Sequence, residues 1–332
     1  MLNGKSILVT GGTGSFGHQF VSYVLDHYEP KKIIIYSRDE YKQFVMQNEY
    51  KKHPQADKLR FFIGDVRDKE RLYRAFDGVD YVVHAAALKQ VPSCEYNPME
   101  AVKTNINGAM NIVDAALDCG VKRVVALSTD KAVNPINLYG GTKLVSDKLF
   151  IAANAYAGEK DVNFSIVRYG NVAGSRGSVI PFFRNIVANG GTSLPITDYR
   201  MTRFWISLEQ GVELVIKALS EAKGGETFIS KIPSFKITDL AQAILPGCEM
   251  PEVGIREGEK LHEIMVTRED SLLTYEYDKH FIVYPHFDWW DKDKIQTGGK
   301  KVEQGFEYSS GKNTEWLSVD DLKELLIDVK EH

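Results

Sequence analysis

A glycine-rich turn between a short apolar strand and a helix constrains this chain more than any other feature of its sequence. Residues 6–10 read Ser-Ile-Leu-Val-Thr, and the turn over residues 11–17 reads Gly-Gly-Thr-Gly-Ser-Phe-Gly. Hydrophobic residues then recur at helical spacing as far as Tyr28. Glycines spaced three apart suit a tight turn, the close approach of a pyrophosphate, and the packing of helix on strand. The pattern predicts a dinucleotide-binding fold.

Strands and helices are expected to alternate through the first half of the chain. The expected strands cover residues 6–10, 32–36, 59–63, 81–84, 123–129 and 164–168, and the helices cover 38–53, 67–76, 98–119 and 138–157. This alternation predicts an α/β protein with a Rossmann-type, doubly wound parallel sheet.

A chain of 332 residues exceeds the usual single core, so two lobes are expected. After about residue 170 the alternation loosens. We expect residues 1–173 plus 206–245 to form an NADP-binding Rossmann domain, and 174–205 plus 246–332 to form a smaller C-terminal substrate-binding lobe. The aromatic stretch 284–290 is expected in the core of that lobe or at a subunit contact.

Composition narrows the class of protein. The net charge of −4 gives no reason to expect nucleic acid or a membrane surface as a partner. The three cysteines lack the paired spacing of a metal site, and a disulfide framework is not expected. No apolar run reaches about 18 residues, so no membrane span is expected. The first residues turn to glycine too soon for a signal peptide. These features favour a cytoplasmic enzyme without a metal.

The end of the second expected strand decides between NAD and NADP. Ser37, Arg38 and Lys42 can surround a 2′-phosphate, which favours NADP, whereas Asp39 could instead bind the ribose of NAD. Small residues after the fourth strand let a cofactor lie close to the backbone. The full set of expected cofactor contacts is Gly11, Thr13, Gly14, Ser15, Phe16, Gly17, Ser37, Arg38, Lys42, Asp65, Val66, Ala85, Ala86, Lys89, Tyr139, Lys143 and Val172.

Two pairs of side chains carry the expected chemistry. Tyr139 and Lys143 are four residues apart on one helix and therefore share a face. A lysine ammonium lowers the pKa of a nearby phenol, so the pair suits oxidation of an alcohol. Asp130 and Lys131 follow the fifth strand, and a carboxylate beside an amine suits removal of water next to a ketone. We expect desolvation in the cleft to leave the Lys131 amine neutral enough to act as a base.

Ten segments form a recognisable set of motifs along nearly the whole chain: residues 10–17, 36–40, 62–68, 84–89, 127–132, 134–140, 168–172, 174–178, 201–205 and 258–263. Together they resemble those of extended short-chain dehydrogenase/reductases, and more narrowly soluble UDP-N-acetylglucosamine 4,6-dehydratases of the inverting type that opens pseudaminic acid synthesis. This resemblance implies a bilobal fold, tightly held NADP, UDP-N-acetylglucosamine as substrate, and a homo-oligomer, either a hexamer or a dimer.

The resemblance also implies a role for each catalytic residue. Tyr139 would be the base for oxidation at carbon 4, with Lys143 as its electrostatic partner. Lys131 would take the proton from carbon 5, and Asp130 would protonate the departing hydroxyl of carbon 6. Thr129 would bind the sugar oxygen at carbon 4.

Substrate contacts follow from the same resemblance. Lys89 would meet the acetamido sugar or the nicotinamide ribose, and Asn171 would lie near the diphosphate. Arg256 and Glu259 would hold the diphosphate and the ribose. The residues expected near the nucleotide are Arg176, Gly177, Ser178 and Val179, with Arg203 and His262 as weaker candidates.

Alternatives stay open at this point. The chain departs from many inverting relatives at Gln90 and Ala101, which leaves open inversion or retention at carbon 5. It also leaves open whether a 5,6-unsaturated sugar is released. A sugar-nucleotide 4-epimerase would share the Tyr139–Lys143 pair but would not need Asp130 and Lys131. A non-catalytic NADP-binding sensor would be expected to have lost the Tyr139–Lys143 pair, which this chain retains.

Overall fold

The computed structural model describes residues 1–174 and 177–329. Its α-helices are α1 (Ser15–His27), α2 (Glu40–Tyr50), α3 (Lys69–Phe76), α4 (Val91–Tyr96), α5 (Pro98–Val102), α6 (Gly108–Cys119), α7 (Leu138–Tyr156), α8 (Val179–Ala188), α9 (Leu208–Glu221), α10 (Ile237–Ile244) and α11 (Val319–Ile327). Its strands are β1 (Ser6–Thr10), β2 (Lys32–Ser37), β3 (Leu59–Ile63), β4 (Tyr81–His84), β5 (Arg123–Thr129), β6 (Asn163–Tyr169), β7 (Thr202–Phe204), β8 (Thr227–Ser230), β9 (Ser234–Lys236), β10 (Ile264–Val266), β11 (Thr274–Glu276), β12 (His280–Val283), β13 (Lys300–Lys301) and β14 (Tyr308–Ser309).

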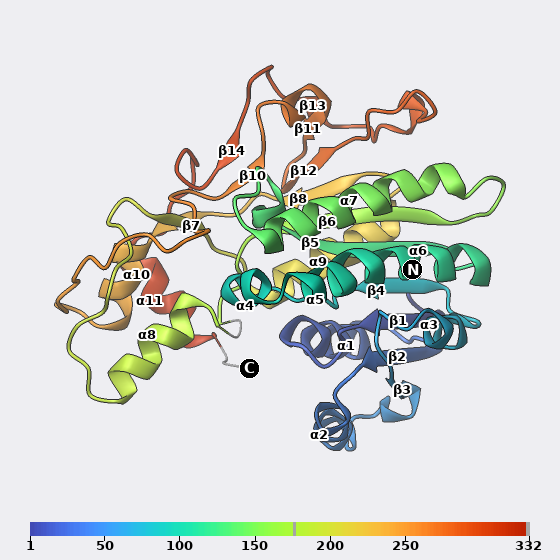
Figure 1. Cartoon of the computed structure of the whole chain (residues 1–332), viewed down its shortest axis with the longest axis horizontal. Helices are drawn as coiled ribbons and strands as arrows, with labels where there is room; N and C mark the ends of the chain where they lie inside the picture. The colour runs from blue at the N-terminus through green and yellow to red at the C-terminus, as the bar shows by residue number, and fades with distance from the viewer. Residues whose placement is uncertain (175–176, 330–332) are drawn as a thin grey trace.

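A ten-stranded sheet forms the centre of the molecule (Figure 1). Its order is β13-β11-β12-β8-β6-β5-β4-β1-β2-β3, and β3-β2-β1-β4-β5-β6 pair in parallel. That six-strand order is the Rossmann order, in which the order of strands reverses between β1 and β4 while all six strands stay parallel. Every residue of β1 is buried, as expected for a parallel strand covered on both faces. The predicted fold class is confirmed.

Helices cover both faces of this sheet. On one face, Phe20 of α1 and Val215 of α9 belong to one apolar cluster with Val9. On the other face, Ile112 of α6 and Phe150 of α7 belong to a second cluster, which also contains residues of α3. The parallel part of the sheet is thereby packed between two apolar cores.

The helix expected over residues 98–119 is interrupted by a π-helical turn, η2 (Lys103–Asn107). Asn105 in this turn donates from its side-chain amide to the Leu88 carbonyl and to Thr142 on α7. Its Oδ1 in turn accepts the Leu88 N–H. The turn therefore fixes the loop that follows β4 against the helix carrying Tyr139.

The edge of the sheet formed by β13, β11 and β12 comes from residues that were expected in the smaller lobe. Residues 246–332 were expected in the smaller lobe, but β12 pairs antiparallel with β8, and β11 and β13 extend the same sheet. Burial of Phe281 and Ile282 in the main core explains this placement. Of the aromatic stretch 284–290, Tyr284 and Trp290 pack in the same core, where the Trp290 indole donates to the Gly224 carbonyl at 2.7 Å, whereas Phe287 and Trp289 are exposed.

A smaller lobe lies beside the carboxyl ends of the parallel strands, around α8, α10 and α11 (Figure 1). Its apolar cluster includes Phe183, Trp205, Leu240 and Leu322. Helix α10 belongs to this cluster although residues 237–244 were expected in the Rossmann domain. Within residues 1–174 and 177–329, the longest apolar helices fall short of what crossing a bilayer requires.

Candidate active site

A cleft of about 1000 Å³ lies between the carboxyl ends of the parallel strands and the smaller lobe. It brings together most of the residues singled out from the sequence. Its lining includes Gly11, Thr13, Gly14, Ser15, Phe16, Gly17, Ser37, Arg38, Lys42, Asp65, Val66, Ala85, Ala86, Lys89, Thr129, Lys131, Tyr139, Lys143, Asn171, Val172, Gly177, Ser178, Val179, Arg256 and Glu259. Arg176 lies outside the described residues.

The glycine turn at one end of the cleft has the geometry of a dinucleotide cradle. Gly11 has a φ of +65°, and a Cβ there would lie 2.9 Å from the Ala86 backbone. A Cβ on Gly17 would collide with the Gly12 carbonyl. Gly14 caps α1 without a side-chain hydrogen bond, so the first N–H groups of the helix are available to an anion. The turn therefore fits the pyrophosphate of a dinucleotide.

Charged side chains line the adenosine end of the cleft. The Asp39 carboxylate caps α2 by accepting the Lys42 N–H, and it pairs with the Lys42 ammonium at 3.2 Å. These bonds hold the pKa of Asp39 below its usual value. Asp65 accepts from Arg67 and lies 3.6 Å from the Arg38 guanidinium. Asp39 is thus engaged with its own helix, and Arg38 lines the cleft beside the end of β2.

The tyrosine and lysine of α7 are both buried and both face the cleft. Asn137 caps this helix by accepting the Gly140 N–H. Burial raises the pKa of Tyr139 to about 12, and the charge of Lys131 and a hydrogen bond with Thr129 act against that rise. Burial lowers the pKa of Lys143, opposed by Asp147 one turn further along the helix. The cation that favours the Tyr139 phenolate is therefore Lys131, whereas the sequence pointed to Lys143.

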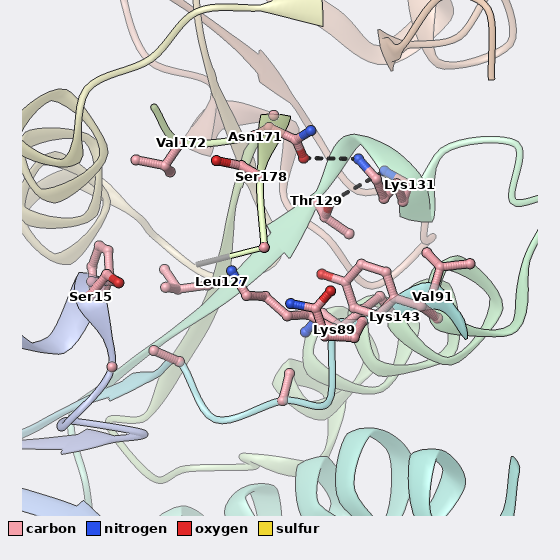
Figure 2. Close-up of a pocket in the computed structure, with 18 of the residues that line it drawn as sticks. Ser15, Lys89, Val91, Leu127, Thr129, Lys131, Lys143, Asn171, Val172 and Ser178 are labelled. Carbon is pink, nitrogen blue, oxygen red and sulfur yellow. Dashed lines mark hydrogen bonds between the residues drawn. The ribbon is translucent and has the colours of Figure 1, made fainter. Parts of the chain in front are cut away.

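Lys131 is held by three oxygen atoms from three separate segments. Its Nζ lies 3.1 Å from Asp130 Oδ1, 3.0 Å from Asn171 Oδ1 and 3.3 Å from Glu263 Oε1. Figure 2 shows the bond between Lys131 and Asn171, with Lys143 and Lys89 elsewhere around the pocket. Asn171, which was expected near a diphosphate, lines the cleft and accepts a hydrogen bond from Lys131.

The two carboxylates keep Lys131 charged. Burial alone would lower the pKa of Lys131, but Asp130 and Glu263 raise it above its ordinary value. The expectation that desolvation leaves this amine neutral is therefore wrong. Burial and the charge of Glu263 together raise the pKa of Asp130. One proton can therefore be held either by the Lys131 amine or by the Asp130 carboxyl, whose atoms lie 3.1 Å apart.

Asp130 stands one hydrogen bond away from the cleft. Its side chain is 1% exposed, and a Cβ on Gly170 would lie 3.0 Å from its Oδ2. Thr129, which lines the cleft, donates its hydroxyl to Asp130 Oδ1 at 3.0 Å. Thr129 and Lys131 therefore lie between the cleft and the Asp130 carboxyl, the group expected to protonate the departing hydroxyl.

The structure gives different positions to the two weaker candidates, His262 and Arg203, and it brings a further residue, Glu263, to the site. The His262 ring bonds to Thr202 and lies against Gly311, which indicates a packing role. Arg203 lines the cleft with its Nε 3.8 Å from Glu263. Glu263 was not singled out from the sequence, although it closes a segment that carried the family resemblance. Its position just before the short apolar strand β10 was the available signal.

Comparison with known proteins decides the family. A model of the family described as "Polysaccharide biosynthesis protein" matches residues 7–285. A UDP-N-acetylglucosamine 4,6-dehydratase (inverting) from Campylobacter jejuni is 55% identical over 98% of each chain. The chain belongs to the polysaccharide biosynthesis family of extended short-chain dehydrogenase/reductases. The resemblance inferred from the sequence is confirmed.

Other members of this extended dehydrogenase/reductase group are also similar. A UDP-glucose 4-epimerase from Rickettsia canadensis is 40% identical over 97% of this chain and 95% of its own length. The X-ray structure of Pen from Bacillus thuringiensis superposes with a TM-score of 0.89 at 37% identity, covering 99% of this chain and 98% of that one. The dTDP-glucose 4,6-dehydratase DesIV from Streptomyces venezuelae, solved with NAD bound, gives a TM-score of 0.69 at 26% identity, covering 77% and 86%.

Proposed function

We propose that this chain is an NADP-dependent UDP-N-acetylglucosamine 4,6-dehydratase that inverts carbon 5. The observation that carries the proposal is that Tyr139, Thr129 and Lys131 line one cleft, and that Thr129 and Lys131 both bond to the buried Asp130 carboxylate. Tyr139 suits oxidation, and the Asp130–Lys131 pair suits elimination of water. The name and the 55% identity of the Campylobacter jejuni relative support the same reaction and substrate.

The residues of the cleft fit a dinucleotide. The uncapped start of α1 suits the pyrophosphate, and Arg38 suits a 2′-phosphate, which favours NADP over NAD. Bound there, NADP would supply the acceptor for the hydride of carbon 4 and the donor of that hydride to carbon 6, with a proton added at carbon 5 completing the saturated sugar. The engagement of Asp39 as a helix cap further supports NADP, because the charge of its carboxylate is offset by the Lys42 N–H and the Lys42 ammonium.

Oxidation at carbon 4 requires a base for the hydroxyl proton. Tyr139 is that base, and its deprotonation is favoured by the positive charge of Lys131 and by hydrogen bonding with Thr129. Lys143 lines the same cleft, one turn along the helix that carries Tyr139. These residues orient the hydroxyl and accept its proton.

Elimination then uses the ketone formed at carbon 4. The neighbouring carbonyl acidifies the hydrogen on carbon 5, and Lys131 removes it after its ammonium has passed a proton to Asp130. Asp130 supplies the proton with which the hydroxyl of carbon 6 leaves as water, passing it through the hydroxyl of Thr129. The raised pKa of Asp130 suits a group that must hold a proton until the hydroxyl departs.

The remaining polar residues of the cleft hold the substrate. Arg256 and Glu259 suit the diphosphate and the ribose of the nucleotide, and Lys89 suits the acetamido sugar. We assign the reaction to an early step of pseudaminic acid or related surface-glycan synthesis, and we expect a homo-oligomer. Light scattering on the purified protein tests the expectation of a hexamer or a dimer.

The test of the proposed function is incubation with UDP-N-acetylglucosamine and NADP, followed by mass spectrometry. Loss of one molecule of water from the sugar supports dehydration. A product of unchanged mass would favour a 4-epimerase instead, which the name of the Rickettsia canadensis relative makes the second candidate. NMR of the product made in deuterium oxide distinguishes inversion from retention at carbon 5, and it also detects release of an unsaturated sugar.

A further inference from the structure

We propose that Glu263 is a positioning residue that holds the Lys131 amine over the cleft and stabilises the ammonium formed when Lys131 takes the proton from carbon 5. This inference rests on the proposed dehydration. It assigns a part of the catalytic machinery to the C-terminal segment, far along the chain from the Asp130–Lys131 pair.

The contact between Glu263 and Lys131 is short and shielded from water. Glu263 Oε1 lies 3.3 Å from Lys131 Nζ, and the carboxylate is 2% exposed. Its second oxygen is buried and has no hydrogen-bond partner among the described residues. A buried carboxylate acts on a neighbouring charge more strongly than an exposed one, because water does not screen the pair.

The backbone around Glu263 gives this carboxylate a fixed position. The Glu263 N–H donates to the Ser310 hydroxyl at 2.9 Å, and the Glu263 carbonyl accepts the Ser310 N–H at 2.8 Å. The Ser310 hydroxyl also lies 2.8 Å from the hydroxyl of Thr202. Three segments distant in the chain thus hold Glu263 at the wall of the cleft.

Several charged or titratable groups surround the lysine. Asp130 and Glu263 are the carboxylates, Arg203 and Lys260 are the neighbouring cations, and Tyr139 is the neighbouring phenol. Burial opposes ionisation of Glu263, but Lys131 and Arg203 outweigh burial and lower its pKa. Glu263 is therefore the carboxylate that keeps its negative charge, whereas Asp130 is the one that can hold a proton.

This division of charge gives a balanced sequence of proton transfers. The Lys131 ammonium first passes one proton to Asp130 Oδ1, 3.1 Å away, leaving an amine and a carboxylic acid. The amine then takes the carbon 5 proton, and the electron pair of that C–H bond forms the double bond between carbons 5 and 6. The carbon 6 hydroxyl leaves as water with the proton from Asp130. Lys131 is again an ammonium and Asp130 a carboxylate, while Glu263 stays negative throughout.

The first test is the substitution Glu263→Gln, which keeps an oxygen near Lys131 but removes the charge. We expect elimination of water to slow by at least about tenfold relative to oxidation at carbon 4. Reduced nicotinamide should then accumulate when substrate is added. Glu263→Asp restores the charge and should recover part of the elimination rate. Wild-type elimination in Glu263→Gln would overturn the proposal.

Glu226→Gln is the matched control. Glu226 is a buried carboxylate that accepts the N–H groups of Lys223 and Gly224, outside the lining of the cleft. Its substitution should lower stability without changing the ratio of oxidation to elimination. An equal change of that ratio in both variants would mean that any lost buried carboxylate disturbs the site, and it would overturn the specific role of Glu263.

A second measurement does not depend on turnover. NMR of nitrogen-labelled lysine side chains follows the titration of Lys131, with its signal assigned by the variant Lys131→Arg. Glu263→Gln should lower the pKa of Lys131 relative to wild type, and an unchanged titration would overturn the proposal. If the wild-type protein fails to dehydrate UDP-N-acetylglucosamine, the proposed function fails, and the titration still decides whether Glu263 acts on Lys131.

Discussion

The Nζ of Lys131 lies 3.1 Å from the Oδ1 of Asp130, and the two side chains sit at the carboxyl end of β5. The carboxylate is buried behind the lysine, so only the amine of this pair lines the cleft. The lysine also influences Tyr139, because its charge lowers the pKa of the phenol. One ammonium therefore connects the group proposed for oxidation with the group proposed for elimination.

Replacing Tyr139 by Phe should abolish oxidation at carbon 4. Loss of a positioned general base costs about 10²–10⁴-fold in rate. Reduced nicotinamide should fail to form in the presence of substrate, which stopped-flow absorbance measures. Phe keeps the ring that packs beside Cys94 and Ala101, so binding of NADP should be retained. Oxidation at the wild-type rate would exclude Tyr139 as the base.

The pH dependence of oxidation should respond to Lys131. Burial raises the pKa of Tyr139 to about 12, and the positive charge of Lys131 acts to lower it. The oxidation rate should therefore rise with pH, because the phenolate fraction rises. In Lys131→Met the favourable charge is lost, so the profile should move to higher pH. A profile that moves to lower pH, or does not move, would contradict the assigned electrostatics.

Arg38→Ala should reduce the preference for NADP. A charge-assisted hydrogen bond contributes roughly 1.5–3 kcal/mol, so the affinity for NADP should fall by about tenfold or more, and the affinity for NAD should change little. Calorimetry with each dinucleotide measures both values. Lys51→Ala removes an exposed cation at the other end of α2 and is the control. Equal losses for both dinucleotides would argue against a 2′-phosphate site at Arg38.

Alanine at Gly14 and alanine at Gly17 should give different defects. A Cβ on Gly14 meets only the Gly11 carbonyl, at 3.2 Å, so its methyl group projects into the space left for a pyrophosphate. Gly14→Ala should weaken NADP binding while the fold stays intact. Gly17→Ala places a methyl group against the Gly12 backbone and should cost about 1–3 kcal/mol of stability. Dinucleotide titration and thermal unfolding of both variants distinguish the two effects.

His84 should make stability fall as the solution becomes acidic. Burial lowers the pKa of this imidazole from 6.5 to about 3, so the unfolded chain binds more protons than the folded one between those values. Stability is therefore fully present above pH 6.5, and this residue alone should account for a loss of about 2 kcal/mol by pH 5. Urea unfolding at several pH values measures the loss.

The variant His84→Asn provides the comparison for that measurement. Asparagine can still bond to the Thr10 hydroxyl, which lies 2.8 Å from His84 Nδ1, but it does not titrate. The variant should be less stable than wild type at neutral pH, and its stability should fall less steeply with acid. Identical slopes for both proteins would mean that His84 is not the group responsible.

Local patterns were sufficient to predict the dinucleotide half of the molecule. The glycine turn and the strands β1 to β6 follow from short-range periodicity, because each strand is a brief apolar run and each helix repeats its own spacing. Tyr139 and Lys143 were predicted together since their spacing places them on one face of one helix. These features depend on residues that are neighbours in the chain.

The rest of the site depends on contacts between distant segments. Glu263 lies 132 residues from Lys131 and reaches it only because β10 and β14 pair beside the cleft. The burial of Asp130 depends on the Gly170 backbone at the end of β6. The antiparallel strands β11 to β13 are two to four residues long, and their pairing at the edge of the sheet leaves no periodic signal. Tertiary packing, rather than local propensity, decides these positions.

The most direct test compares two rates in the variant Lys131→Ala, the rate of oxidation at carbon 4 and the rate of elimination of water. The variant is mixed with UDP-N-acetylglucosamine and NADP, and both reduced nicotinamide and the sugar product are followed. We predict that reduced nicotinamide forms, while the rate of elimination of water falls by about 10²–10⁴-fold. Dehydration at the wild-type rate would contradict the assignment of Lys131 as the base for carbon 5.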